Sequence, residues 1–285
     1  MYGEFKLEMP QQLDEALALI AEDPAEVLSG GTNLMIELRA RKLRPEQVVS
    51  LDALSELRGI EVDGNRITLG ARTTISDILR CDDMAEFGPS LLDAANLFAG
   101  QMVRNMGTVG GNIACSSPAA DLVPPLMSLD AEITLVSSKG TRKVALCDYY
   151  LSYKKDVRAP SEMITSVSWK KLAKNSSNSF YKLARRIGDA ITVTGVAVTL
   201  TMDGDRCTTA RIALGAVAPT VFRATNAEKI LEGQILTDDL ITTAAQQAKA
   251  QSSPISDVRA SAEYRLHTVG KLTHRLLTQA RDKLV

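Results

Sequence analysis

Short runs of alternating apolar and polar residues in the first part of the chain are separated by segments with a helical pattern. Residues 5–9 and 47–54 are expected to be strands, and residues 25–31 a strand that runs into a glycine turn. Residues 12–22 place apolar side chains at the spacing of one helix face, and a second helix is expected over residues 32–41. This order predicts a compact βαβα unit that ends near residue 55.

The middle of the chain mixes hairpins with helices. Its pattern predicts hairpins at residues 59–71 and 131–150, helices at residues 73–80 and 89–104, and a closing strand at residues 162–169. Thr74 or Ser76 is expected to cap the first of these helices.

A polar, low-complexity stretch at residues 173–179 is the best candidate for a domain boundary or a mobile loop. Strand-like alternation follows over residues 191–217, with a turn at Asp203-Gly204, and the tail over residues 224–284 is mostly helical. We therefore expect an α+β protein in three parts, with a three-stranded antiparallel sheet plus helices in the last: residues 1–55, 56–172 and 178–285.

Composition places the chain among ordinary globular proteins and argues against several functions. Of its 285 residues, 45% are hydrophobic and 24% are charged, and the formal net charge is −1. Without a basic excess, the chain lacks the electrostatic footprint of general nucleic-acid or membrane-surface binding. Its first residues do not have the pattern of a secretory signal, and no apolar run reaches about 20 residues. We therefore expect a cytoplasmic protein without a membrane span.

Cysteine and histidine do not have the spacing of metal ligands. The four cysteines are far apart, and the two histidines, His267 and His274, are seven residues apart near the C-terminus. We therefore expect no metal or iron–sulfur site on this chain. Cys115 is more often explained as a small, half-buried filler than as a redox thiol.

The first of two glycine loops follows the strand that is expected to end at Ser29. Gly30 and Gly31 make the turn, and a helix is expected to begin near Thr32 or Asn33. Backbone N–H groups at such a helix start favour an anion, and glycine lets a phosphate approach the backbone closely. The alternative is an ordinary strand–helix turn with a threonine or asparagine cap.

The second glycine loop covers residues 107–121, GTVGGNIACSSPAAD. Its three glycines allow a tight backbone, while Thr108 and Asn112 offer side-chain hydrogen bonds and Asp121 can accept from sugar or polyol hydroxyls. The alternative is an ordinary loop with a capping aspartate. Together the two loops suit a ligand with phosphates and a polyol, and neither supplies a catalytic base.

A charged segment, YKLARRIGD at residues 181–189, combines one aromatic residue, three cations and one acid. Charge runs of this kind are usually solvated strands. The functional alternative is an aromatic residue beside a bound ring, with a lysine near the electronegative edge of that ring.

Four segments in the same order resemble the FAD-binding subunit, or middle domain, of the molybdenum hydroxylases, which include xanthine dehydrogenase and aerobic carbon monoxide dehydrogenase. They are SGGTNL at residues 29–34, residues 98–121, residues 181–189, and GAVAPTVFRA at residues 215–224. The resemblance covers essentially the whole chain. It implies a vanillyl-alcohol-oxidase (PCMH)-type FAD-binding fold of two α+β subdomains, followed by a small C-terminal antiparallel sheet with helices.

The resemblance also implies which residues hold the FAD. Those expected at its pyrophosphate are Ser29, Gly30, Gly31, Thr32, Asn33, Leu34, Thr108, Gly110, Gly111 and Asn112. Asp121 is expected at ribityl or ribose hydroxyls, and the residues expected along the cofactor or at its ring are Phe98, Ala99, Ile164, Tyr181 and Lys182. No catalytic residue and no metal ligand is implied on this chain.

By the same resemblance, the chain is a flavoprotein electron-transfer subunit of a molybdenum hydroxylase complex. Its FAD would accept electrons from 2Fe–2S clusters on a small partner subunit, and the molybdopterin cofactor would lie on a large subunit, usually in a dimer of heterotrimers. The acceptor would be NAD, a quinone, oxygen or another molecule, at a face shaped by Arg185, Arg186 and Asp189. The alternatives are a stand-alone FAD-dependent oxidoreductase of the same fold and a structural subunit without FAD.

Overall fold

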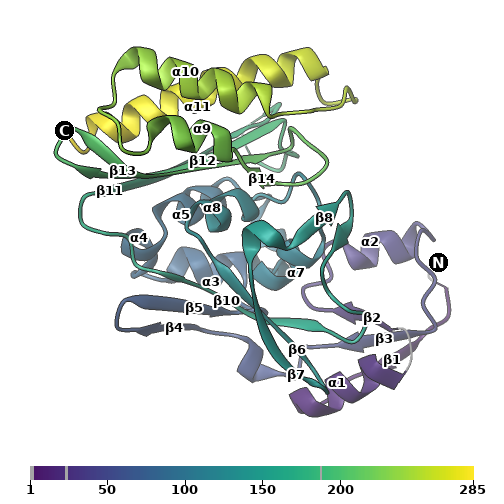
Figure 1. Ribbon diagram of the computed structural model, residues 1–285. Helices are drawn as coiled ribbons and strands as arrows, with labels where there is room; N and C mark the ends of the chain where they lie inside the picture. Colours follow the sequence, from purple (N-terminus) through teal and green to yellow (C-terminus); the bar gives the residue numbers. More distant parts are fainter. Residues whose placement is uncertain (1–2, 23–24, 187) are drawn as a thin grey trace.

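A computed structural model of the chain describes residues 3–22, 25–186 and 188–285. Figure 1 shows its layers: C-terminal helices cover one face of a sheet, middle helices lie against the other face, and two further sheets lie beyond them. No helix in these ranges is both long and apolar enough to cross a bilayer.

The N-terminal unit is a three-stranded parallel sheet in the order β1-β3-β2. Its elements are β1 (Lys6–Glu8), α1 (Leu13–Glu22), β2 (Ala25–Leu28), α2 (Leu34–Arg39) and β3 (Gln47–Ser50), followed by a 3₁₀ turn, η1 (Ser55–Leu57). The predicted βαβα order is therefore present. The apolar side chains of α1 that share one face pack with β3 in a small hydrophobic cluster.

The middle unit has a five-stranded antiparallel sheet in the order β4-β5-β10-β6-β7. The strands are β4 (Ile60–Asp63), β5 (Arg66–Gly70), β6 (Glu132–Ser137), β7 (Gly140–Ala145) and β10 (Met163–Lys170). Six short helices connect them: α3 (Ile75–Arg80), α4 (Met84–Phe87), α5 (Pro89–Asn96), α6 (Gln101–Met106), α7 (Val109–Ala114) and α8 (Val123–Ser128). A 3₁₀ turn and a small hairpin complete the unit: η2 (Leu146–Asp148), β8 (Tyr150–Ser152) and β9 (Lys155–Asp156).

Two local predictions for this unit differ from the structure. The helix expected over residues 89–104 is broken between Asn96 and Gln101, where Ala99 has a positive φ of 36°. The stretch expected as a loop contains α7, because the Thr108 side chain accepts from Gly111 N at 3.1 Å and caps a short helix there. Thr74 is the cap of α3, with a complete capping box.

The C-terminal unit is an antiparallel sheet in the order β11-β12-β13-β14, covered by helices on one face. The elements are β11 (Ser176–Leu183), β12 (Thr194–Asp203), β13 (Arg206–Gly215), β14 (Phe222–Arg223), α9 (Thr225–Leu231), α10 (Asp238–Ala250) and α11 (Ala262–Asp282). The expected three-stranded sheet thus has a fourth strand of two residues.

Both faces of this sheet are buried, each in a different core. Successive side chains of a strand point to opposite faces, so Val196 and Val198 join the core formed with α9, α10 and α11. Phe180, Ala197 and Ala213 point the other way and belong to the core of the middle unit. The sheet therefore joins two otherwise separate cores.

The polar stretch at residues 173–179 is a loop only in its first half, because β11 begins at Ser176. Asn178 is buried and accepts from Ser90 N at 2.8 Å, and its amide donates to Thr199 Oγ1 at 2.7 Å and to Ser128 Oγ at 3.3 Å. The polarity that indicated a mobile connector comes in part from this buried polar contact between β11 and the helices of the middle unit.

We predict that Asn178→Ala lowers the free energy of unfolding by about 1–3 kcal/mol, because the buried Ser90 N–H then loses its acceptor. Urea unfolding of the full chain measures the loss. Ser179→Ala, at the next and less buried position of β11, is the matched control and should change stability by less than about 0.5 kcal/mol. Equal losses for the two variants would contradict this role of Asn178.

Candidate functional site

The structure brings the two glycine loops into direct contact. Ser29 Oγ lies 3.1 Å from Thr108 Oγ1, a hydrogen bond between residues 79 positions apart. A Cβ added at Gly30 would overlap the carbonyl oxygen of Met106 and lie 3.2 Å from Cα of Gly107. Because the backbones meet this closely, Gly30 is required at this point for packing between the loops.

At each of the other glycines of the site, the structure shows a different reason for glycine. Gly110 packs on Ala71, the residue after β5, since a Cβ at Gly110 would lie 2.6 Å from the Cβ of Ala71. Gly31 has a φ of +69°, which favours glycine. A Cβ at Gly111 would lie 2.8 Å from the Thr108 hydroxyl that caps α7. The tight backbone expected of the second loop is present at Gly110 and Gly111, and Gly31, which is expected to let a phosphate approach, has a structural role as well.

Backbone donors differ between the two loops. In the second loop, the N–H groups of Val109, Gly110 and Asn112 donate to the carbonyls of Thr73, Ala71 and Thr108. In the first loop, the N–H groups of residues 30–33 have no acceptor among the described residues. These free N–H groups lie beside the hydroxyls of Ser29 and Thr108. Together they form a donor set that suits phosphate oxygens and the expected FAD pyrophosphate.

A buried ion pair lies at the other end of the second loop. Lys182 Nζ lies 2.6 Å from Asp121 Oδ2 and donates to the Leu97 carbonyl at 3.3 Å, while Thr192 Oγ1 donates to Asp121 Oδ1. The Lys182 and Asp121 side chains are only 5% and 11% exposed. Burial raises the pKa of the Asp121 carboxyl, and the Lys182 ammonium and the Thr192 hydroxyl oppose that rise.

Further hydrogen bonds connect this pair to the loops. Leu122 N donates to Asn112 Oδ1 at 3.2 Å, which holds the segment beside Asp121 against α7. Arg104 Nη1 donates to the carbonyls of Phe98 and Ala99 at 3.0 and 2.9 Å, so it fixes the bend between α5 and α6. The expected residues of the first loop, the second loop and this bend are thus linked by contact.

Two expected residues lie in other surroundings. Ile164 on β10 is buried in the core of the middle unit. Tyr181 points to the face of β11 opposite Lys182, and the guanidinium of Arg275 on α11 lies 4.0 Å from its ring centroid. Successive side chains of a strand point to opposite faces, so Tyr181 and Lys182 lie on opposite faces of β11 although they are adjacent in the sequence.

Sequence reasoning missed several side chains that support the site. Thr192 contacts Asp121 from a stretch expected only as alternating strand. Arg158 donates to Asp156 at 2.9 Å and to the Ala114 carbonyl at 3.3 Å, and Tyr150 Oη donates to the Ile113 carbonyl at 3.2 Å. These bonds hold the C-terminal end of α7. No local motif marks them, because their partners Asp121, Ala114 and Ile113 come from distant segments.

The charged residues after β11 are on the surface. Arg185 and Arg186 are exposed and donate to the carbonyls of Val258 and Asp189 at 3.3 and 2.9 Å. Ile187 of this segment lies outside the described residues. Cys115 lies 3.4 Å from Lys154 Nζ, and the part of the chain that the structure describes contains no cluster of three or more potential metal ligands.

Known proteins match this chain over nearly its whole length. Residues 3–169 match the family described as FAD binding domain in molybdopterin dehydrogenase, and residues 179–280 match the CO dehydrogenase flavoprotein C-terminal domain. The carbon monoxide dehydrogenase medium chain of Afipia carboxidovorans is 33% identical, over 99% of this chain and 98% of that protein. The glyceraldehyde dehydrogenase medium chain of Sulfolobus acidocaldarius is 32% identical, over 95% and 96% of the two chains.

A solved structure agrees with these matches. The carbon monoxide dehydrogenase of Hydrogenophaga pseudoflava that lacks the Mo-pyranopterin moiety superimposes with a TM-score of 0.95 at 30% identity, covering 98% of each chain. The expected fold of two α+β subdomains and a C-terminal antiparallel sheet with helices is thereby confirmed. The chain belongs to the FAD-binding family of the molybdopterin dehydrogenases, with a C-terminal domain of the carbon monoxide dehydrogenase flavoprotein type.

Proposed function

We propose that this chain is the electron-transfer flavoprotein subunit of a molybdenum hydroxylase complex. The FAD supplies the redox chemistry, taking electrons from 2Fe–2S clusters of a partner subunit and passing them to NAD, a quinone, oxygen or another acceptor. The observation that carries the proposal is the contact between the two glycine loops through Ser29 and Thr108. That contact assembles one binding surface from segments that are far apart in the sequence.

The residues that would hold the FAD follow from this contact. The free N–H groups of the first loop and the hydroxyls of Ser29, Thr32 and Thr108 would bind the pyrophosphate, with Gly30, Gly31, Asn33, Leu34, Gly110, Gly111 and Asn112 forming the surface. Asp121 and Lys182 would lie along the rest of the cofactor with Phe98 and Ala99. Since Tyr181 and Ile164 belong to two hydrophobic cores, we propose packing roles for them.

The ion pair of Lys182 and Asp121 has a positioning role in this proposal. Asp121 follows the second glycine loop, Lys182 lies on β11, and Thr192 precedes β12, so the pair ties the loop to the C-terminal sheet. Because Asp121 compensates the charge of Lys182, the pair can orient hydroxyl groups of a ligand without a large net charge.

The partners follow from the family. We propose a small 2Fe–2S subunit and a large molybdopterin subunit, assembled as a dimer of heterotrimers, with the exposed Arg185 and Arg186 near the acceptor. The similar proteins named above are medium chains of carbon monoxide and glyceraldehyde dehydrogenases, so the family alone does not identify a substrate for this complex. We place this assembly in the cytoplasm.

We also propose that the chain is organised as three parts, residues 1–55, 56–172 and a C-terminal part. Three separate hydrophobic clusters support this division. The C-terminal part is best begun at Ser176 instead of residue 178, because β11 starts there.

An absorption spectrum tests the proposed function. The chain is expressed alone and together with its partner subunits, and the cofactor released on denaturation is identified. We expect the near-ultraviolet and blue bands of oxidised flavin, with FAD as the released molecule. A colourless protein in the full assembly would falsify the proposal and leave a structural subunit.

We predict that Gly30→Ala weakens FAD binding about tenfold or more, because the added Cβ overlaps the Met106 carbonyl and forces the two loops apart. Titration of the cofactor-free chain with FAD measures the affinity. Gly270→Ala on α11 is the matched control, since its Cβ would lie 3.7 Å from the nearest atoms of Lys249. Wild-type affinity in Gly30→Ala would show that the contact between the loops is not needed.

We predict that Lys182→Met destabilises the protein more at high pH than at low pH. The change removes a cation that lowers the pKa of Asp121. Burial already raises this pKa, so without Lys182 it is higher still in the folded state. A carboxyl with a raised folded pKa retains its proton on folding, and stability is lost as pH rises above its unfolded pKa of about 3.9.

The expected loss is about 3–5 kcal/mol at neutral pH and shrinks toward pH 4, measured by urea unfolding at a series of pH values. The double variant Lys182→Met/Asp121→Asn is the control, because it also removes the Asp121 carboxyl and should lose the extra pH dependence. A loss that is independent of pH would mean that the ion pair is not the cause.

A further inference from the structure

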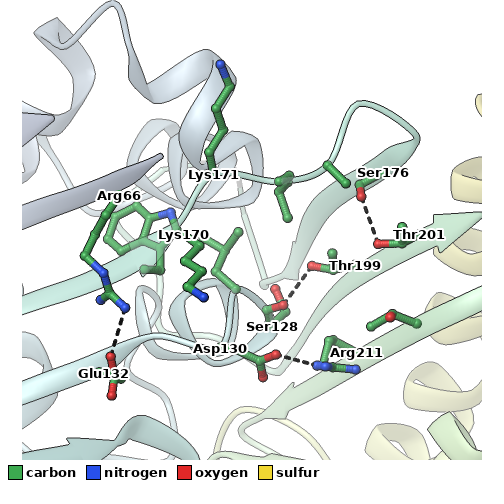
Figure 2. A pocket seen from close by; sticks show the side chains of 15 residues that line it. Arg66, Ser128, Asp130, Glu132, Lys170, Lys171, Ser176, Thr199, Thr201 and Arg211 are labelled. Carbon is green, nitrogen blue, oxygen red and sulfur yellow. Dashed lines mark hydrogen bonds and ion pairs between the residues drawn. The ribbon is translucent and has the colours of Figure 1, made fainter. Parts of the chain in front are cut away.

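A polar groove lies between the middle and C-terminal units, away from the glycine loops. Its volume is about 590 Å³, which is within the range of small-molecule sites. Figure 2 shows the groove, with the ends of β5 and β10 on one side and β11, β12 and β13 on the other. None of the sixteen residues expected at the FAD lines it.

The groove and the Lys182–Asp121 pair lie at opposite ends of one sheet face. Ser176 and Lys182 are both on β11 and, being an even number of residues apart, point to the same face. They are six positions apart along the strand, which is about 20 Å. Between them, Asn178 and Phe180 pack against the middle unit, so the groove is a separate space.

The lining of the groove carries charges of both signs. Its cations are Arg66, Lys170, Lys171 and Arg211, and its carboxylates are Asp130 and Glu132.

Three of these cations have acidic partners. Arg66 pairs with Glu132 at 3.1 Å, Arg211 with Asp130 at 2.6 Å and with Glu232 at 3.2 Å, and Lys171 with Glu86. Glu86 and Glu232 lie outside the lining. Asp130 also accepts from Arg223 at 2.6 Å, and Arg223 pairs with Glu228 as well.

Lys170 is the cation of the groove with no acidic partner among the described residues. In Figure 2 its side chain extends from β10 toward the space between Arg66 and Ser128, whereas Lys171 points away from them. An ammonium without an acidic partner is suited to an anionic oxygen.

Hydroxyl side chains form much of the remaining surface. Ser176 and Thr201 share a hydrogen bond of 2.8 Å, and Thr199 donates to the Ser128 carbonyl at 2.9 Å. The Thr209 hydroxyl makes no hydrogen bond within the described parts of the chain. Since a hydroxyl both donates and accepts, this surface suits a ligand that has hydroxyl groups of its own.

We propose that this groove is a binding site for a sugar phosphate, with Lys170 bound to the phosphate and the threonine and serine hydroxyls of the sheet bound to the sugar. Lys170 supplies the uncompensated positive charge of the lining, and a lysine ammonium is a common ligand of phosphate. The site is independent of the proposed FAD function, since it shares no residue with it.

Ribose 5-phosphate is the probe, titrated into the full chain in the presence of excess FAD and followed by calorimetry. Trp169, the only tryptophan of the chain, lines the groove and gives a second signal through its fluorescence. We expect saturable binding, and at least about tenfold weaker binding of both ribose and inorganic phosphate.

Lys170→Gln should weaken the binding of ribose 5-phosphate about tenfold or more, because it removes the charged donor. Lys174→Gln is the matched control: Lys174 is an exposed lysine four residues further on that does not line the groove, and this variant should bind as the wild type does.

Three results would overturn the proposal: no saturable binding to the wild type, equal affinity in Lys170→Gln, or release of FAD by the probe, which would place the probe at the flavin site. Equal affinity for inorganic phosphate would overturn the sugar as part of the ligand.

Discussion

Strand β11 packs into two cores at once, and the arrangement of the molecule depends on this. Its side chains alternate between a face covered by α11 and a face that lies on α5 and α8. Tyr181 belongs to the first core and Phe180 to the second. A shift of one residue in the register of β11 would exchange these faces, removing Phe180 from the middle core and Lys182 from Asp121.

The same face shows how one sheet can serve three purposes along its length. At one end Lys182 meets Asp121, in the centre Phe180, Ala197 and Ala213 are apolar, and at the other end hydroxyls and Arg211 line a groove. The apolar centre excludes water and joins the units, so it also keeps the two polar ends apart. Each end is therefore free to have its own chemistry.

Close backbone contact is the second constraint, and it explains why the glycines of the site cannot be replaced freely. Gly30 lies on the backbone of residues 106 and 107, and Gly110 lies on Ala71. These contacts bring together segments from two different sheets. A ligand that binds both loops would gain from a surface that is already assembled, since little further ordering is required.

The sequence by itself determined the order of elements, the α+β class, the family and the position of both glycine loops, because these follow from periodicity, turn residues and local motifs. It placed most strands well, and it mistook the polar half of β11 for a connector, since a buried hydrogen-bond partner such as Ser90 leaves no local signal.

Only the tertiary structure decided that Lys182 pairs with Asp121, that Tyr181 points away from it, and that Thr192 and Arg158 support the site. Each of these contacts joins residues that are distant in the chain or depends on which face of a strand is buried, and both are fixed by packing.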